Sequence, residues 1–262
     1  QLIRKDAPIM LGVSLLTLVL AADGAMGWLD GVLLLLGLIA YTYFALRQSR
    51  AENFQVQEEY AGEFSQKETP TARRLTLNIL FIAGGLGLLA LGADWLVQAA
   101  VRIARALGVN ELVIGLTIVA AGTSLPEAAT SVIAAFKKES DIAVGNAVGS
   151  NIYNLLGVLG IGSLAARGGI PVPAHVLRFD MPVMIFVALV TLPIFFIGSR
   201  ISRLEGMLFI SYFALYMVYI VMEAQGSPYL PAVKSLGLFY VSTTFLVLTA
   251  AAFLSARGKT AG

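Results

Sequence analysis

The run Ala-Ala-Gly-Thr-Ser-Leu-Pro-Glu, which ends at Glu127, gathers several oxygen ligands in one short stretch. Thr123 and Ser124 precede Glu127 by four and three residues, so on a helix the three side chains share one face. Pro126 lacks an N–H and clashes with the carbonyl four residues back, and the nearby carbonyl of Ala120 is also partly freed. Carboxylate, hydroxyl and carbonyl oxygens together are typical ligands of hard cations such as Na⁺ or Ca²⁺.

Glu127 is also the one carboxylate near the middle of a hydrophobic segment, about 15 Å along a helix from Lys137. An ionised carboxylate at that depth in a membrane costs several kcal/mol unless a cation or hydrogen-bond donors compensate it. The alternative is a protonated Glu127 that is hydrogen-bonded to a neighbouring helix. The oxygens that precede it favour the cation site.

A second polar stripe follows on the next apolar segment, where Asn146, Ser150 and Asn154 recur every four residues. This spacing places the three side chains on one face of a helix. Because Glu127 needs a facing partner, we expect Ser150 and Asn154 to supply further ligands. The alternative is that these residues only join helices by hydrogen bonds, and for Asn151 that is the preferred interpretation.

The composition is that of an integral membrane protein. Of 262 residues, 58% are apolar and only 13% are charged, with a mean hydropathy of +0.82, whereas soluble domains carry about a quarter charged residues. The absence of cysteine and the single histidine, His175, exclude disulfides, thiolate sites and His-rich metal clusters. A net charge of +2 without a basic stripe argues against nucleic acid as a partner.

Eight apolar segments are long enough to be candidate membrane spans. All should be helical, because backbone groups without hydrogen-bond partners are too costly in lipid. They cover roughly residues 7–22, 29–46, 75–101, 112–136, 142–165, 181–197, 204–222 and 236–254. If the N-terminus is cytoplasmic, most of the 18 Lys and Arg residues lie on the cytoplasmic side. We therefore expect both termini in the cytoplasm, and a prokaryotic plasma (inner) membrane as the location.

Two parts of the chain resemble each other at an offset of about 175 residues. Residues 4–10 match residues 178–184, and the acidic-Gly pair at Asp30 matches the pair at Glu205. We interpret four acidic residues as helix caps or anchors at the membrane boundary: Asp30, Glu205, Asp6 and Asp180. An odd number of spans per repeat makes the two copies inverted, an arrangement typical of secondary transporters.

Residues 114–127 and 141–154 together resemble the α-repeat of the cation/calcium antiporter superfamily, the sodium/calcium exchangers. The close resemblance covers about residues 85–173. It implies two inverted five-helix halves joined by a cytoplasmic loop, which exchange Na⁺ for Ca²⁺ at one central site lined by both α-repeats. It also implies an ion-ligand set of Glu127 as principal carboxylate, oxygens of Thr123 and Ser124, the carbonyl of Ala120, and Ser150 and Asn154 from the facing helix.

The resemblance does not identify the ion whose gradient drives the exchange. Some members carry Asp at the position of Asn154, and a second acid changes the charge of the site and its ion selectivity. This chain offers only an amide there, so K⁺ dependence and the use of H⁺ in place of Na⁺ both stay open.

The expected fold is all-α and polytopic, with about eight transmembrane helices and the first α-repeat missing. Residues 1–46 would be the last two helices of the first repeat, 47–74 a cytoplasmic linker, 75–222 the second repeat, and 223–262 an additional helix and tail. Half of the family's ion site is then absent, so a missing N-terminal half or a second subunit is expected to complete it. We expect no cofactor, only transported Ca²⁺ and Na⁺ and the lipid bilayer.

The predicted function is a secondary Na⁺/Ca²⁺ antiporter that works by alternating access, not an enzyme. One alternative is a proton/cation exchanger in which Glu127 takes the proton, and another is a non-transporting partial subunit. An intramembrane hydrolase that uses Glu127 or Asp94 would lack a suitable acid pair or a histidine set. Asp94, with Arg102 and Arg105 a few turns further on, is better explained by a salt bridge or a solvated position at the rim.

Overall fold

The computed structural model describes residues 2–60, 72–198 and 201–260, and helices account for most of them. Seven described helices are long and apolar enough to cross a membrane. The bent pair Thr117–Thr123 and Leu125–Phe136 raises the number to as many as eight if it forms one span. The expectation of an all-α polytopic membrane protein with about eight spans is confirmed.

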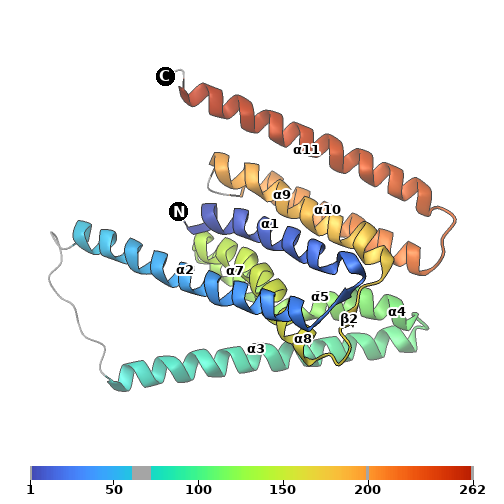
Figure 1. Cartoon of the computed structure of the whole chain (residues 1–262), viewed down its shortest axis with the longest axis horizontal. Coiled ribbons are helices and arrows are strands. Elements are labelled where there is room, and N and C mark those ends of the chain that lie inside the picture. Colours follow the sequence, from blue (N-terminus) through green and yellow to red (C-terminus); the bar gives the residue numbers. More distant parts are fainter. Residues whose placement is uncertain (1, 61–71, 199–200, 261–262) are drawn as a thin grey trace. The chain divides into compact units, whose positions relative to one another are not determined.

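The N-terminal elements are α1 (Leu2–Leu20), the 3₁₀ turn η1 (Ala21–Asp23), β1 (Ala25–Met26), α2 (Trp28–Tyr60) and α3 (Ala72–Ala106). Next come α4 (Glu111–Ile114), the π-helix η2 (Gly115–Val119), α5 (Ala120–Thr123), α6 (Leu125–Phe136), α7 (Ser140–Tyr153), the π-helix η3 (Asn154–Val158) and α8 (Leu159–Ala165). The chain continues through β2 (Ile170–Pro171), the π-helix η4 (Val176–Asp180), α9 (Met181–Gly198), α10 (Arg203–Ala224) and α11 (Leu230–Thr260), as Figure 1 shows. The two short strands pair antiparallel, with Ala25 opposite Pro171.

Helix α2 runs beyond its apolar segment into the expected linker over residues 47–74. Residues 47–60 are helical and contain neither Gly nor Pro, while Glu, Gln, Arg and Ala are all good helix formers. A polar sequence can therefore prolong a transmembrane helix without a break. The rest of the expected linker, residues 61–71, lies outside the described residues.

The chain divides into two compact units that do not follow the order of the sequence. Unit 1 comprises Gln1–Thr69 and Asp141–Phe195, and unit 2 comprises Pro70–Ser140 and Phe196–Gly262. The segment 75–222, expected to form one repeat, contributes to both units. Its helices α7 and α8 belong with α1 and α2, whereas α3 to α6 belong with α10 and α11.

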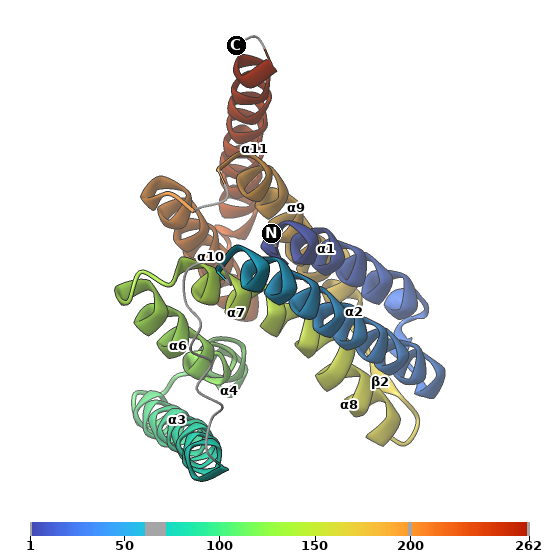
Figure 2. The same ribbon diagram turned by 90° about the vertical axis from the view of Figure 1, so that its left-hand side faces the viewer.

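Unit 1 is held together by the close approach of α2 to α8, which lie side by side in Figure 2. Small residues allow this approach, as is usual between membrane helices. A Cβ atom at Gly31 would lie 2.8 Å from the carbonyl oxygen of Gly160. Leu34, Ile152 and Leu156 are buried in the core beside this contact.

In unit 2, the span that carries the Thr-Ser-x-Pro-Glu run is broken at Ser124. The helical segments on either side meet at 51°, and Pro126 lies in the first turn of α6. Helix α3 packs against both segments. Gly122 is buried there, and a Cβ atom on it would overlap Cγ2 of Val97. The glycine therefore lets α3 reach the break.

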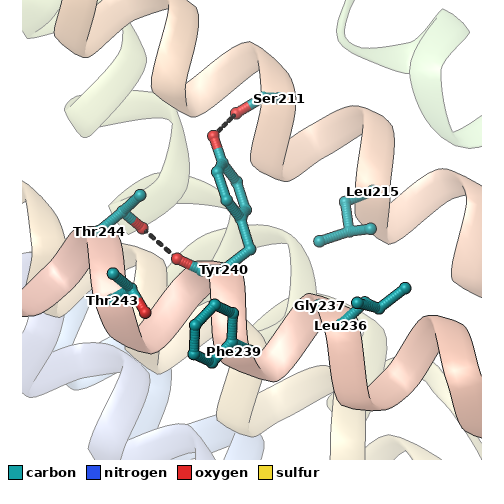
Figure 3. A pocket seen from close by; sticks show the side chains of 8 residues that line it. All are labelled: Ser211, Leu215, Leu236, Gly237, Phe239, Tyr240, Thr243 and Thr244. Atoms are coloured by element: carbon teal, nitrogen blue, oxygen red, sulfur yellow. Dashed lines mark hydrogen bonds between the residues drawn. The ribbon is translucent and has the colours of Figure 1, made fainter.

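No role for α11 was predicted from the sequence. In the structure, α11 packs on α10 through hydroxyl groups. The Ser211 and Tyr240 hydroxyls lie 2.8 Å apart, and the Tyr212 hydroxyl is hydrogen-bonded to Thr244. The rings of Tyr212 and Tyr240 meet edge to face, with centroids 5.8 Å apart. Figure 3 shows Tyr240 pointing from α11 toward Ser211, beside a cavity of about 460 Å³.

The repeated acidic-Gly pairs cap two helices, as the sequence predicts. Oδ2 of Asp30 accepts a hydrogen bond from the Gly27 N–H (2.7 Å) at the start of α2. Oε2 of Glu205 accepts one from the Ser202 N–H (2.6 Å) at the start of α10, and the Ser202 hydroxyl accepts the Glu205 N–H in return. Asp6 differs from them, because it is buried, with 8% of its surface exposed.

Gly31→Ala should destabilise the protein, because the new methyl group would press on a backbone oxygen that cannot move away cheaply. Overpacking of this kind costs about 1–3 kcal/mol, so the melting temperature in detergent should fall by several degrees. Gly12→Ala is the matched control, since a Cβ atom at Gly12 meets nothing within 4 Å. Equal melting temperatures for the two variants would contradict this account of the α2–α8 contact.

Gly122→Ala should be more disruptive, because its methyl group would overlap Cγ2 of Val97. Val97→Ala removes both γ-carbons and leaves a Cβ atom 3.4 Å from the new methyl group, an ordinary contact. The double variant should therefore regain much of the thermal stability that Gly122→Ala loses. If Val97→Ala lowers the melting temperature equally in both backgrounds, the two residues are not coupled.

Candidate cation site

Ala120 and Thr123 form a pair of adjacent oxygens at the break in unit 2. The N–H of Ser124 donates to the carbonyl of Ala121 (3.2 Å), a tighter turn than the α-helical bond to Ala120. The Ala120 carbonyl instead accepts a hydrogen bond from the Thr123 hydroxyl at 2.9 Å. A hydroxyl that donates its proton keeps its lone pairs, so the Thr123 oxygen remains available to a cation.

Glu127 lies in the first turn of α6, where the helix dipole favours a negative charge. The residue is half-buried and its Oε2 atom is buried. One turn further on, the Thr130 hydroxyl donates to the carbonyls of Pro126 (3.0 Å) and Glu127 (2.9 Å) and so supports the turn that carries the carboxylate. Thr130 was not predicted from the sequence, although its hydroxyl lies three residues after Glu127, on the same helix face.

In unit 1, Ser150 and Asn154 lie on successive turns, Ser150 near the end of α7 and Asn154 at the start of η3. The Ser150 hydroxyl donates to the carbonyl of Ala147 at 3.1 Å. The Asn151 side-chain amide donates to the same carbonyl at 2.8 Å. Asn151, expected to join two helices, is thus bonded to its own helix.

A π-helix adjoins each set of candidate ligands. Helix η2 ends at Val119, directly before Ala120, and η3 begins at Asn154. π-helical turns are rare, and they replace the regular α-helical hydrogen-bond pattern over a few residues. They occur often at functional sites. The apolar periodicity of the sequence did not predict either π-helix.

The six predicted ligands therefore fall into two groups. Ala120, Thr123, Ser124 and Glu127 lie on the two helical segments that flank the break in unit 2 and at the break itself, and Ser150 and Asn154 follow one another on successive turns in unit 1. Their role as ligands stays a prediction. Within the part of the chain that the structure describes, no group of three or more His, Cys, Asp or Glu side chains could hold a metal ion.

Of the two alternatives predicted for Asp94, a salt bridge or a solvated position at the rim, the exposure of Asp94 agrees with the solvated position. Oδ2 of Asp94 accepts a hydrogen bond from the Gln98 side chain at 2.8 Å. Arg105 instead makes two hydrogen bonds to Glu111, at 2.6 and 2.9 Å. The hydrogen bonds from Arg105 hold the pKa of Glu111 below its usual range. Glu111 lies six residues after Arg105, just beyond the end of α3, so that its carboxylate reaches the Arg105 guanidinium group.

Comparison with known proteins gives a clear family. The family model described as sodium/calcium exchanger protein matches residues 77–222. CaxA of Alkalimonas amylolytica is 36% identical over 219 residues, which are 82% of this chain and 66% of CaxA. The inner membrane protein YrbG of Escherichia coli K12 is 32% identical over 190 residues, 72% of this chain and 58% of YrbG.

A solved structure of the sodium-calcium exchanger NCX_Mj has the same fold, with a TM-score of 0.59 and 29% identity. The alignment covers 86% of this chain and 65% of NCX_Mj. The chain thus spans about two thirds or less of the length of CaxA, YrbG and NCX_Mj. The expected missing half or second subunit is not supported by these alignments, which run over most of the chain.

The matched residues 77–222 include the broken span and the stripe of Ser150 and Asn154. The matching family is one of ion exchangers rather than enzymes, and the apolar helices are those of a polytopic membrane protein. The chain belongs to the sodium/calcium exchanger family.

Proposed function

We propose that this chain forms the ion-binding part of an antiporter that exchanges Na⁺ for Ca²⁺ by alternating access. The observation that carries the proposal is the break at Ser124. It gathers the Ala120 carbonyl and the Thr123 hydroxyl beside a partly buried carboxylate, Glu127. Discontinuous membrane helices of this kind hold the coupling ions in many secondary transporters.

The ligand set proposed for the ion is the one that the resemblance to the exchanger family implies. Ca²⁺ takes six to eight oxygens, more than the break alone can supply. We infer that the cation lies near the middle of the bilayer. The six residues are Ala120, Thr123, Ser124, Glu127, Ser150 and Asn154, of which only Glu127 is charged.

Competition for these oxygens explains exchange rather than leak. Glu127 without a cation would be an ionised carboxylate in a medium of low dielectric constant, which is strongly unfavourable. Either Ca²⁺ or Na⁺ removes that penalty and allows the site to change the side of the membrane it faces. A site that reorients only when occupied couples the movement of one ion to the opposite movement of the other.

Proton/cation exchange is the second candidate, because Glu127 could take a proton in place of Na⁺ and be neutral while the site reorients. The amide at Asn154 leaves one carboxylate among the six ligands, so a single proton would neutralise the set. The third candidate, a non-transporting partial subunit, predicts no ion flux at all. For the location we propose a prokaryotic inner membrane with both termini cytoplasmic, in keeping with the distribution of Lys and Arg.

Glu127→Gln should abolish Ca²⁺ flux while the protein stays folded. The change keeps the size of the side chain but removes its charge, and loss of one partner of a buried charge pair costs roughly 3 kcal/mol, or about 100-fold in binding. The assay is uptake of radioactive Ca²⁺ into vesicles that hold the full-length protein, driven by a Na⁺ gradient. Glu139→Gln, an exposed carboxylate of the same unit, is the control. Near-normal uptake by Glu127→Gln would exclude Glu127 as the principal ligand.

The coupling ion can be identified in the same vesicles. An outward Na⁺ gradient at equal pH on both sides should drive Ca²⁺ uptake, because Na⁺ competes with Ca²⁺ for the same oxygens. A pH gradient in Na⁺-free medium should not drive it. If the pH gradient drives uptake and the Na⁺ gradient fails, the protein is a proton/cation exchanger.

A further inference from the structure

Thr117 is a half-buried residue in the middle of the π-helix η2, and the proposed exchange does not use it. Its hydroxyl donates a hydrogen bond of 2.6 Å to the carbonyl of Val113, one turn back in α4. Val113 is buried, with 7% of its surface exposed. The bond is partly shielded from water, and a lower local dielectric strengthens it.

This hydrogen bond favours a departure from α-helical geometry. In an α-helix the Val113 carbonyl would accept the N–H of Thr117. A threonine hydroxyl that donates to the carbonyl four residues back competes with this backbone bond and often bends the helix. The wider π-turn occurs at this place, since η2 spans Gly115–Val119. We therefore expect loss of the hydroxyl to favour a regular α-helical turn.

The π-turn leads directly to the first predicted ligand of the cation. The N–H of Ala120 donates to the carbonyl of Gly115, five residues back, and to the carbonyl of Thr117. The Ala120 carbonyl accepts the Thr123 hydroxyl at 2.9 Å. Three hydrogen bonds thus follow one another from α4 to the break, from Thr117 to Val113, from Ala120 to Thr117 and from Thr123 to Ala120.

The π-turn sets the direction in which the residues after it point. It takes up one residue more than an α-helical turn, and one residue corresponds to about 100° of rotation. Without the π-turn, Ala120 and Thr123 would face another direction relative to α4. Helices α3 and α10 contact η2 within unit 2, but apolar packing is not directional. The hydrogen bond of Thr117 is directional and can hold the turn.

We propose that Thr117 is a positioning residue for the cation site: its hydroxyl holds the π-turn η2 and so aims the Ala120 carbonyl and the Thr123 hydroxyl. The proposal rests on the function proposed above, in which these two oxygens bind the ion. Thr117 itself is not one of the six proposed ligands. The hydrogen bonds that carry the proposal all lie within unit 2.

Thr117→Val tests the hydroxyl, because valine has nearly the same shape as threonine. In vesicles that hold the full-length protein, the Ca²⁺ concentration for half-maximal Na⁺-driven uptake should rise about three- to tenfold, the range for loss of one hydrogen bond. Thr117→Ser keeps the hydroxyl and should stay close to the wild type. Destabilisation alone would lower the maximal rate, not the apparent affinity. Equal half-saturating concentrations for Thr117→Val and Thr117→Ser would overturn the proposal.

Thr249→Val is the matched control. Thr249 is a half-buried residue of α11, and its hydroxyl donates to the Phe245 carbonyl at 2.9 Å, the same bond to the carbonyl four residues back. Its loss should leave the half-saturating Ca²⁺ concentration unchanged. A rise as large as that of Thr117→Val would contradict the positioning role. Thr117→Ala also removes the hydroxyl, has a higher helix propensity, and serves if Thr117→Val does not fold.

The wild type and Glu127→Gln in the same vesicles separate this proposal from the proposed function. Na⁺-driven uptake by the wild type that is lost in Glu127→Gln supports the function independently of Thr117. If that result is obtained and Thr117→Val keeps the half-saturating concentration of the wild type, only the positioning role is wrong. Normal uptake by Glu127→Gln, or none by the wild type, would overturn the proposed function and the positioning role with it.

Discussion

An ionised carboxylate inside a bilayer is stable only if cations, donors or helix termini compensate its charge, and Glu127 imposes this constraint on the architecture of unit 2. The span is broken three residues before it, which places Glu127 at a new helix start. Pro126 and the turn at Ser124 free the Ala120 carbonyl from its usual backbone partner. Val97 fits against Gly122, so that α3 supports the break from one side. Each feature costs helical regularity, and each either frees an oxygen atom for the proposed site or supports the break.

In the proposed site, unit 1 would supply only neutral oxygens, those of Ser150 and Asn154, and the π-helix η3 begins at Asn154. Close contacts at Gly37 and Gly157 hold η3 near α2. The rings of Tyr41 on α2 and Tyr153 on α7 meet edge to face directly before η3, and such aromatic contacts are directional.

Much of this could be predicted from the sequence where the determinants are local. Apolar length predicted the spans, Pro126 predicted that nearby carbonyls are partly freed, and the acidic-Gly pairs predicted the caps formed by Asp30 and Glu205. The break itself was not predicted, since residues 112–136 form one apolar segment in the sequence. Pairings that depend on the packed structure could not be predicted, such as Arg105 with Glu111 in place of Asp94. Nor does periodicity reveal a π-turn, because the change of helical phase that it causes leaves no visible sign in a segment that is apolar on most faces. The division into two units could not be predicted either, because helices bury their faces against neighbours in space rather than neighbours in sequence.

The central claim is that the break at Ser124 in unit 2 is where the cation binds, and protection of a cysteine at Thr123 tests it most directly. These 262 residues contain no cysteine, so the rate at which a thiol reagent modifies the single variant Thr123→Cys can be measured with and without Ca²⁺ in a cysteine-free full-length protein. Modification of Thr123→Cys should be slower when Ca²⁺ is bound. Modification of Phe136→Cys should not change, because Phe136 ends α6, three turns from the break. Equal rates for Thr123→Cys with and without Ca²⁺ would contradict a cation site at the break.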